Sequence, residues 1–233
     1  MEFIKVNYDA DIKIKCETEL ERSRAESARW KEPETLAWID SFLPGETLLD
    51  VGANIGLYSL YAASKGCKVL AVEPHPGNYA SLCINKRNNK HCPVNPLWSA
   101  IGMNSETGTF RYENAGAGSS DGGLIKKGTS QFPIAINSVD GLTKDFGPFD
   151  HIKIDVDGEE DLVILGMCVS LREGLFKSCL LEVDDRNRAF VLRSFENGRY
   201  SRGSRLNYMA NHSRIRRTQE GIKVENIIFT RID

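Results

Sequence analysis

The sequence lacks the features of a membrane protein and of a disulfide-rich secreted protein. No apolar run approaches the roughly 18 residues of a membrane span, and the opening Met-Glu-Phe-Ile-Lys has no signal-peptide character. The six cysteines form no Cys-x-x-Cys pair and no zinc-ligand spacing, so we expect reduced thiols in the core. There is no internal repeat and no low-complexity tract. These absences favour a soluble protein, and we expect a cytoplasmic one.

A strand, a tight turn and a helix start are predicted at residues 48–63. Asp50 ends the strand, and Gly52 and Gly56 enclose a turn that contains Asn54. The middle glycine of the dinucleotide fingerprint is absent, which disfavours a diphosphate at the helix N-terminus. Acidic Asp50 instead suits a ligand that carries positive charge. S-adenosylmethionine, with its ammonium and sulfonium groups, is such a ligand.

The next segment, Lys68–Pro74, is predicted to be a second buried strand that ends in Glu73. Glu73 lies about 20 residues beyond the glycine turn, where such folds place an acid that accepts bonds from both ribose hydroxyls. The alternative is that Glu73 is a solvated strand end.

At this point the sequence resembles the FkbM-type methyltransferases. The segments that carry the resemblance are Asp50–Gly56, Val72–Pro76 and Ile152–Glu160, and the similarity runs from about Glu32 to Arg231. The resemblance implies an S-adenosylmethionine-dependent enzyme of the kind that mostly methylates hydroxyl oxygens, often on sugars. Asp157 departs from the family pattern, which more often has glutamate at that position.

The cofactor-binding residues that we expect come from the glycine turn, from the ends of the predicted strands and from the segments that neighbour them in the sequence. Glu32 or Glu34 is expected at the cofactor's amino group, because the family carries a similar Glu-Pro-Glu-Thr segment. Ser99 and Ala100 match the position where these folds contact adenine. The full expected set is Glu32, Asp50, Gly52, Asn54, Gly56, Glu73, Pro74, Asn78, Ser99, Ala100 and Asp155.

The segment 150–160 places Lys153, Asp155 and Asp157 on one face of a predicted strand. Central parallel strands are normally apolar on both faces, so three ionisable side chains there would be costly without a purpose. We predict that Asp155 is the general base and that Lys153 or Glu182 tunes it. A buried structural ion pair is the alternative. A divalent metal bridging Asp155, Asp157 and Glu182 is also left open.

A glycine-rich loop at residues 115–123 is predicted to be either a long hairpin connection or a lid over the substrate. As a lid it would contact the acceptor through Ser119, Ser120 or Asp121, and Asp157 is a further residue expected to contact the substrate. The charged helix predicted at residues 17–29 has two interpretations as well: a solvated face, or a cap over the cofactor.

Residues 186–217 are markedly basic, although the whole chain has a formal net charge of −2. Such a segment suits an anionic glycan, a phosphorylated substrate or nucleic acid, and it is otherwise a solvated surface. Few aromatic residues lie among the arginines, so the segment offers few side chains on which the bases of a single-stranded nucleic acid could stack.

We therefore predict one α/β domain with a mostly parallel, doubly wound methyltransferase sheet, helices on both faces and an antiparallel C-terminal strand. An N-terminal arm and capping helices are expected over residues 1–44, and the cofactor-binding and catalytic core over residues 45–233. The expected activity is methyl transfer from S-adenosylmethionine to a hydroxyl oxygen of a sugar or glycan-like acceptor. The alternatives are a nucleic-acid methyltransferase and a non-catalytic scaffold that retains the cofactor pocket.

Overall fold

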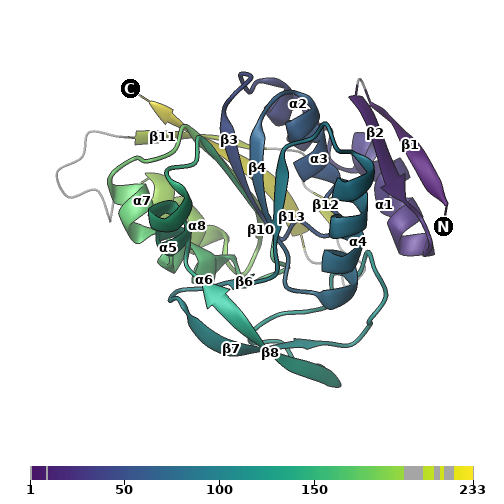
Figure 1. The fold of residues 1–233 in the computed structure, drawn as a ribbon. Helices are drawn as coiled ribbons and strands as arrows, with labels where there is room; N and C mark the ends of the chain where they lie inside the picture. Colours follow the sequence, from purple (N-terminus) through teal and green to yellow (C-terminus); the bar gives the residue numbers. More distant parts are fainter. Residues whose placement is uncertain (1, 9, 197–206, 213–215, 218–222, 233) are drawn as a thin grey trace.

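A mostly parallel central sheet organises the molecule, with strand order β11-β13-β10-β9-β3-β4-β5 and β12 paired to β13 (Figure 1). The computed structural model describes residues 2–8, 10–196, 207–212, 216–217 and 223–232. The strands of this sheet are β3 (Thr47–Val51), β4 (Lys68–Val72), β5 (Val94–Leu97), β9 (His151–Ile154), β10 (Ser178–Asp184), β11 (Asn207–His212), β12 (Arg216–Arg217) and β13 (Lys223–Ile232). β13 runs antiparallel to β10, whereas β10, β9, β3, β4 and β5 are parallel. The predicted α/β fold is confirmed.

Helices cover both faces of the central sheet, with α1 to α4 on one side and α5 to α8 on the other (Figure 1). Their bounds are α1 (Glu19–Lys31), α2 (Pro33–Asp40), α3 (Leu57–Ser64), α4 (Pro76–Asn88), α5 (Val139–Phe146), α6 (Glu160–Leu165), α7 (Cys168–Arg172) and α8 (Arg188–Glu196). Successive strand residues point to opposite faces. Leu48 accordingly lies in one core with Leu60 of α3, while Leu49 lies in the other with Val163 of α6. No described helix combines the length and the apolar composition needed to cross a membrane.

The N-terminal segment forms a hairpin of β1 (Phe3–Tyr8) and β2 (Ala10–Lys15) that is separate from the central sheet. Its buried Ile12 and Ile14 join the core around α3. The side chain of Asn85 in α4 accepts a hydrogen bond from the Lys15 backbone N–H at 2.8 Å. The segment expected to be an N-terminal arm is therefore a β-hairpin that packs against α3 and α4.

A small sheet of β6 (Ala100–Ile101), β8 (Ser130–Asn137) and β7 (Glu106–Tyr112) lies outside the central sheet. The stretch from Val94 to Ile101 is therefore divided between two sheets. The Ser99 hydroxyl bonds the Ala135 carbonyl at 2.8 Å and accepts from the Asn137 side chain at 2.8 Å. These bonds turn the chain away from β5 and direct Ala100–Ile101 to β8.

Candidate active site

The glycine turn after β3 is shaped by the close approach of β9. Gly52 has a φ of 79°, and a Cβ built on it would lie 1.9 Å from the Asp155 carbonyl oxygen. Gly56 also has positive φ, but its Cβ would meet Leu82 of α4. Gly52 therefore brings the turn against the carboxyl end of β9, whereas Gly56 serves the packing of α3 on α4.

Glu73, at the end of β4, is buried and already accepts three hydrogen bonds from the chain. The backbone N–H groups of Asn54 and His75 donate to it at 2.7 and 2.8 Å, and the Asn78 side chain donates at 3.3 Å. Burial raises its pKa to about 7, although these bonds oppose the rise. Since a carboxylate has about four acceptor positions, the carboxylate of Glu73 can accept one further donor.

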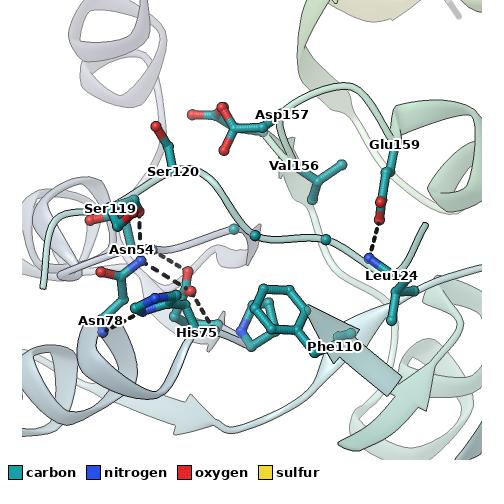
Figure 2. Close-up of a pocket in the computed structure, with 17 residues that line it drawn as sticks. Asn54, His75, Asn78, Phe110, Ser119, Ser120, Leu124, Val156, Asp157 and Glu159 are labelled. Atoms are coloured by element: carbon teal, nitrogen blue, oxygen red, sulfur yellow. Dashed lines mark hydrogen bonds between the residues drawn. The ribbon is translucent and has the colours of Figure 1, made fainter. Parts of the chain in front are cut away.

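The glycine-rich loop is docked on the turn and on α1 rather than projecting into solvent (Figure 2). The Ser119 carbonyl accepts from the side-chain amides of Asn54 and Asn78, each at 2.9 Å. Arg24 of α1 donates to the Gly118 carbonyl at 2.6 Å. Farther along the loop, the buried Glu159 carboxylate accepts from the Leu124 backbone N–H at 2.8 Å. The loop therefore roofs the space between Glu73 and the end of β9.

Beneath this roof lies a first cavity that is open to solvent, with about 520 Å³ of empty space when the part open to solvent is included. It is lined by many of the predicted cofactor and substrate residues: Gly52, Asn54, Glu73, Pro74, Asn78, Ala100, Ser119, Ser120, Asp155 and Asp157. The sequence did not identify Phe110, Val156 or Glu159 as lining residues. Phe110 comes from β7 of the small sheet, which no local motif places beside the glycine turn.

A second cavity, with about 440 Å³ of empty space when the part open to solvent is included, shares Gly52, Asn54 and Asp155 with the first. The predicted residue Glu32 lines it, together with Arg24 and Lys31 of α1. Side chains of both charge signs therefore face this cavity. Because α1 lines the cavity and binds the roof loop, the structure favours the cap interpretation of this helix over a solvated face.

In the wall of the second cavity, Lys153 links two carboxylates. Its Nζ lies 2.9 Å from Asp155 Oδ2 and 3.8 Å from Asp50 Oδ1, and the Ser59 hydroxyl donates to Asp50 Oδ2 at 2.5 Å. Burial lowers the pKa of Lys153, but the charges of Asp155 and Asp50 outweigh burial and raise it. Asp50 is buried and lines neither cavity, so it contacts Lys153 rather than the space for a ligand.

The three carboxylates that the sequence left open as a metal site do converge. One oxygen each of Asp155, Asp157 and Glu182 lies within 4.8 Å of the others. Lys153 already supplies a positive charge to Asp155, and we assign no metal to this cluster.

Other predicted residues lie elsewhere. Ser99 is fully buried and bonds backbone carbonyls, and the Asp121 carboxylate accepts from the Asn114 backbone N–H within the loop. In the basic segment, Arg186 pairs with Asp184, and Arg188 pairs with Glu225. Its residues at Arg199, Arg202, Arg205 and Arg214 lie outside the described residues.

The fold resembles solved methyltransferase-class structures over most of the chain. TYW2 of M. jannaschii, in complex with AdoMet, matches with a TM-score of 0.51 and 15% identity over 97% of this chain and 84% of that one. Trm5b of Pyrococcus abyssi matches with a TM-score of 0.51 and 12% identity over 86% of this chain and 48% of that one. The fold, the glycine turn and the acid after β4 define an S-adenosylmethionine-dependent methyltransferase fold.

The sequence pattern described as the methyltransferase FkbM domain matches residues 50–216, and the chain belongs to this family. A local match of another kind also occurs. Over 52 residues the chain is 42% identical to a tRNA (guanine(37)-N(1))-methyltransferase of Coprinopsis cinerea. That stretch is 22% of this chain and spans only 11% of the relative's length.

Proposed function

We propose that this chain transfers a methyl group from S-adenosylmethionine to a hydroxyl oxygen of a sugar or glycan-like acceptor. The observation that supports the proposal is the pair of cavities that meet at Gly52, Asn54 and Asp155, at the carboxyl ends of β3, β4 and β9. Open α/β sheets bind ligands at this edge. An extended, zwitterionic molecule fits two joined cavities of unlike character.

The residues present match the groups of the cofactor. Glu73 offers one remaining acceptor position to a ribose hydroxyl, and Pro74 and Ala100 line the same cavity. In the second cavity, Glu32 suits the ammonium group, and Arg24 and Lys31 suit the carboxylate. The cofactor supplies an electrophilic methyl group whose sulfur leaves as a neutral thioether.

The acceptor end of the first cavity favours an uncharged acceptor group. Asp155, Asp157 and Glu159 line it, and Lys153 pairs only with the first of these. A phosphate there would be repelled by the negative charge of these carboxylates. A hydroxyl can instead donate its proton to a carboxylate, which is the help that a poor oxygen nucleophile needs.

A nucleic-acid acceptor is the second candidate, favoured by the local match to the tRNA methyltransferase and by the basic segment. The test is transfer of tritium from labelled S-adenosylmethionine to a panel of methyl glycosides and, in parallel, to tRNA transcripts. Glycoside labelling that persists at high salt supports the proposal. Labelling of tRNA alone, lost steeply as salt rises, would establish the second candidate. Binding of S-adenosylhomocysteine with no labelling of any acceptor would support the scaffold alternative.

A further inference from the structure

Asp157 differs from the other carboxylates at the strand ends in having no hydrogen-bond or ion-pair partner within the described part of the chain. It occupies the turn between β9 and α6 with a φ of 57°, and its half-buried side chain lines the first cavity. Figure 2 shows Asp157 and Ser120 at one side of this cavity, with His75 and Phe110 at the opposite side. Asp157 makes no side-chain hydrogen bond and no ion pair with any residue that the structure describes. All of its acceptor capacity is available to a molecule in the cavity.

Asp155, the base favoured by the sequence, is in the opposite situation. Its Oδ2 lies 2.9 Å from the buried Lys153 ammonium. Burial raises the pKa of Asp155, but the charge and hydrogen bond of Lys153 outweigh burial, so its pKa lies below the ordinary value. A carboxylate held in this way is a weak base, because proton uptake would break a charge-assisted bond and leave Lys153 with one partner fewer.

We propose that Asp157 is the general base that takes the proton of the acceptor hydroxyl, while the Lys153–Asp155 pair holds a fixed negative charge beside it. This inference rests on the proposed function. The proton passes from the acceptor oxygen to an Asp157 carboxylate oxygen, and the O–H electron pair stays on the acceptor oxygen. That oxygen forms the bond to the methyl carbon, and the sulfur keeps the electron pair of the broken C–S bond.

The charges around Asp157 are suited to this role. Asp155, Glu160 and Glu182 place negative charge beside it from β9, α6 and β10, while Lys126 and Arg24 place positive charge from the loop and α1. Burial, followed by the charge of Asp155, raises the pKa of Asp157 to about 7, although Lys126 and Arg24 act to lower it. A general base is most effective with a pKa near the working pH. Two neighbouring carboxylates with pKa values pushed apart are a recurring acid–base arrangement.

The other nearby candidates are less suited. The His75 ring is fixed by two contacts, since Nε2 lies 2.8 Å from the Asn114 carbonyl and Nδ1 accepts from the Asn78 backbone N–H at 3.4 Å. Glu182 lies near Asp157 but lines neither cavity. Asp157 alone among these combines the cavity wall with an unbonded carboxylate.

The first experiment needs neither cofactor nor acceptor. Protein labelled with ¹³C at aspartate side-chain carboxyls is titrated by NMR, which excludes the glutamates Glu73 and Glu160. We expect an aspartate signal that titrates near pH 7 in the parent chain and is lost in Asp157→Asn. The signal of Asp50, whose pKa burial also raises, should persist in that variant. In Asp155→Asn the signal of Asp157 should titrate at lower pH, because a neighbouring negative charge is lost. The control Asp161→Asn, in the first turn of α6, should leave it unchanged. If no aspartate signal near pH 7 is lost in Asp157→Asn, the proposal is overturned.

The second experiment uses labelled S-adenosylmethionine with the glycoside panel. We expect Asp157→Asn to lower turnover about 10²- to 10⁴-fold at unchanged affinity for S-adenosylhomocysteine, and Asp157→Glu to restore much of it. Full turnover in Asp157→Asn would contradict the role. Failure of the parent chain to bind S-adenosylhomocysteine would instead refute the proposed function, and the NMR titration would still decide the proton affinity of Asp157.

Discussion

The two ends of β9 both carry buried ionisable side chains, yet they are built differently. At the amino end, His151 Nδ1 lies 2.8 Å from the Ser178 hydroxyl and Nε2 lies 2.9 Å from Glu46. The ring stacks on Phe42 with centroids 3.7 Å apart. At the carboxyl end, Asp155 lines both cavities and Lys153 lines the second.

The two ends differ in whether their polar side-chain atoms have hydrogen-bond partners. At the amino end, Trp38 completes the network by donating its Nε1–H to Ser178 at 2.8 Å. At the carboxyl end, Asp50 Oδ1 is buried without a hydrogen bond within the described chain, and Asp157 has neither a hydrogen bond nor an ion pair there. Ser178, His151 and Glu46 form a chain that resembles a hydrolase triad, but their polar atoms are occupied and buried. Buried charge by itself does not mark a site, whereas buried charge with unused acceptors beside a cavity does.

The largest effect is expected from removing the cation at the carboxyl end. Lys153→Met leaves Asp50 and Asp155 as buried carboxylates without their shared partner. We expect the free energy of unfolding to fall by about 3–5 kcal/mol, as measured by urea denaturation. The control is Lys177→Met at the amino end, where a half-exposed ammonium pairs with Glu46 and Asp150; it should cost at most about 1 kcal/mol. Equal losses in the two variants would remove the distinction between the ends.

A second variant tests the approach of the glycine turn to β9. Gly52→Ala adds a Cβ that meets the Asp155 carbonyl and forces an L-residue to a φ of 79°. We expect a loss of about 1–2 kcal/mol from the backbone strain, a further loss from the clash, and at least a tenfold loss of S-adenosylhomocysteine affinity. Gly147→Ala is the control, because its φ is 92° and no atom lies within 4 Å of the added Cβ. It should show the strain alone, with unchanged ligand affinity.

The sequence predicted the carboxyl edge well where the signal was local. The glycine turn, Glu73 and the charged end of β9 lie together because parallel strands end at one edge. The sequence did not predict the contributions of distant segments. Phe110 belongs to β7 of the separate small sheet. Glu159 holds the roof loop by accepting hydrogen bonds from its backbone N–H groups. The amino-end network was missed as well, because nothing in the spacing of Glu46, His151 and Ser178 reveals that they meet.

Ligand affinity should depend on pH through Glu73. Its pKa of about 7 in the free protein means that part of the population is protonated at neutral pH. Ribose hydroxyls donate to the ionised form, so affinity for S-adenosylhomocysteine should rise about tenfold between pH 6 and pH 8. Calorimetric titration at several pH values measures this. Glu73→Gln, which cannot ionise, should bind weakly at every pH; a slope that persists in this variant would assign the dependence to another group.

The smallest effect is expected at the amino end, on stability alone. Burial lowers the pKa of His151 below its ordinary value of 6.5, although Glu46 opposes the shift. The unfolded chain therefore binds more protons as pH falls, so stability is full above about pH 6.5 and declines as pH falls toward the folded pKa. Thermal unfolding between pH 8 and pH 5 should show this decline. His151→Gln should flatten it, and an unchanged profile would contradict the assignment.

The most direct test of the account is calorimetric titration of S-adenosylhomocysteine into the parent chain and into Glu73→Ala, with NAD as the comparison ligand. We predict micromolar binding to the parent, roughly −8 kcal/mol, and no binding of NAD. In Glu73→Ala the affinity should weaken by about 1.5–3 kcal/mol, the value of a hydrogen bond to a charged group. Equal affinity in the two chains, or no binding to the parent, would contradict a cofactor site at the carboxyl edge of the sheet.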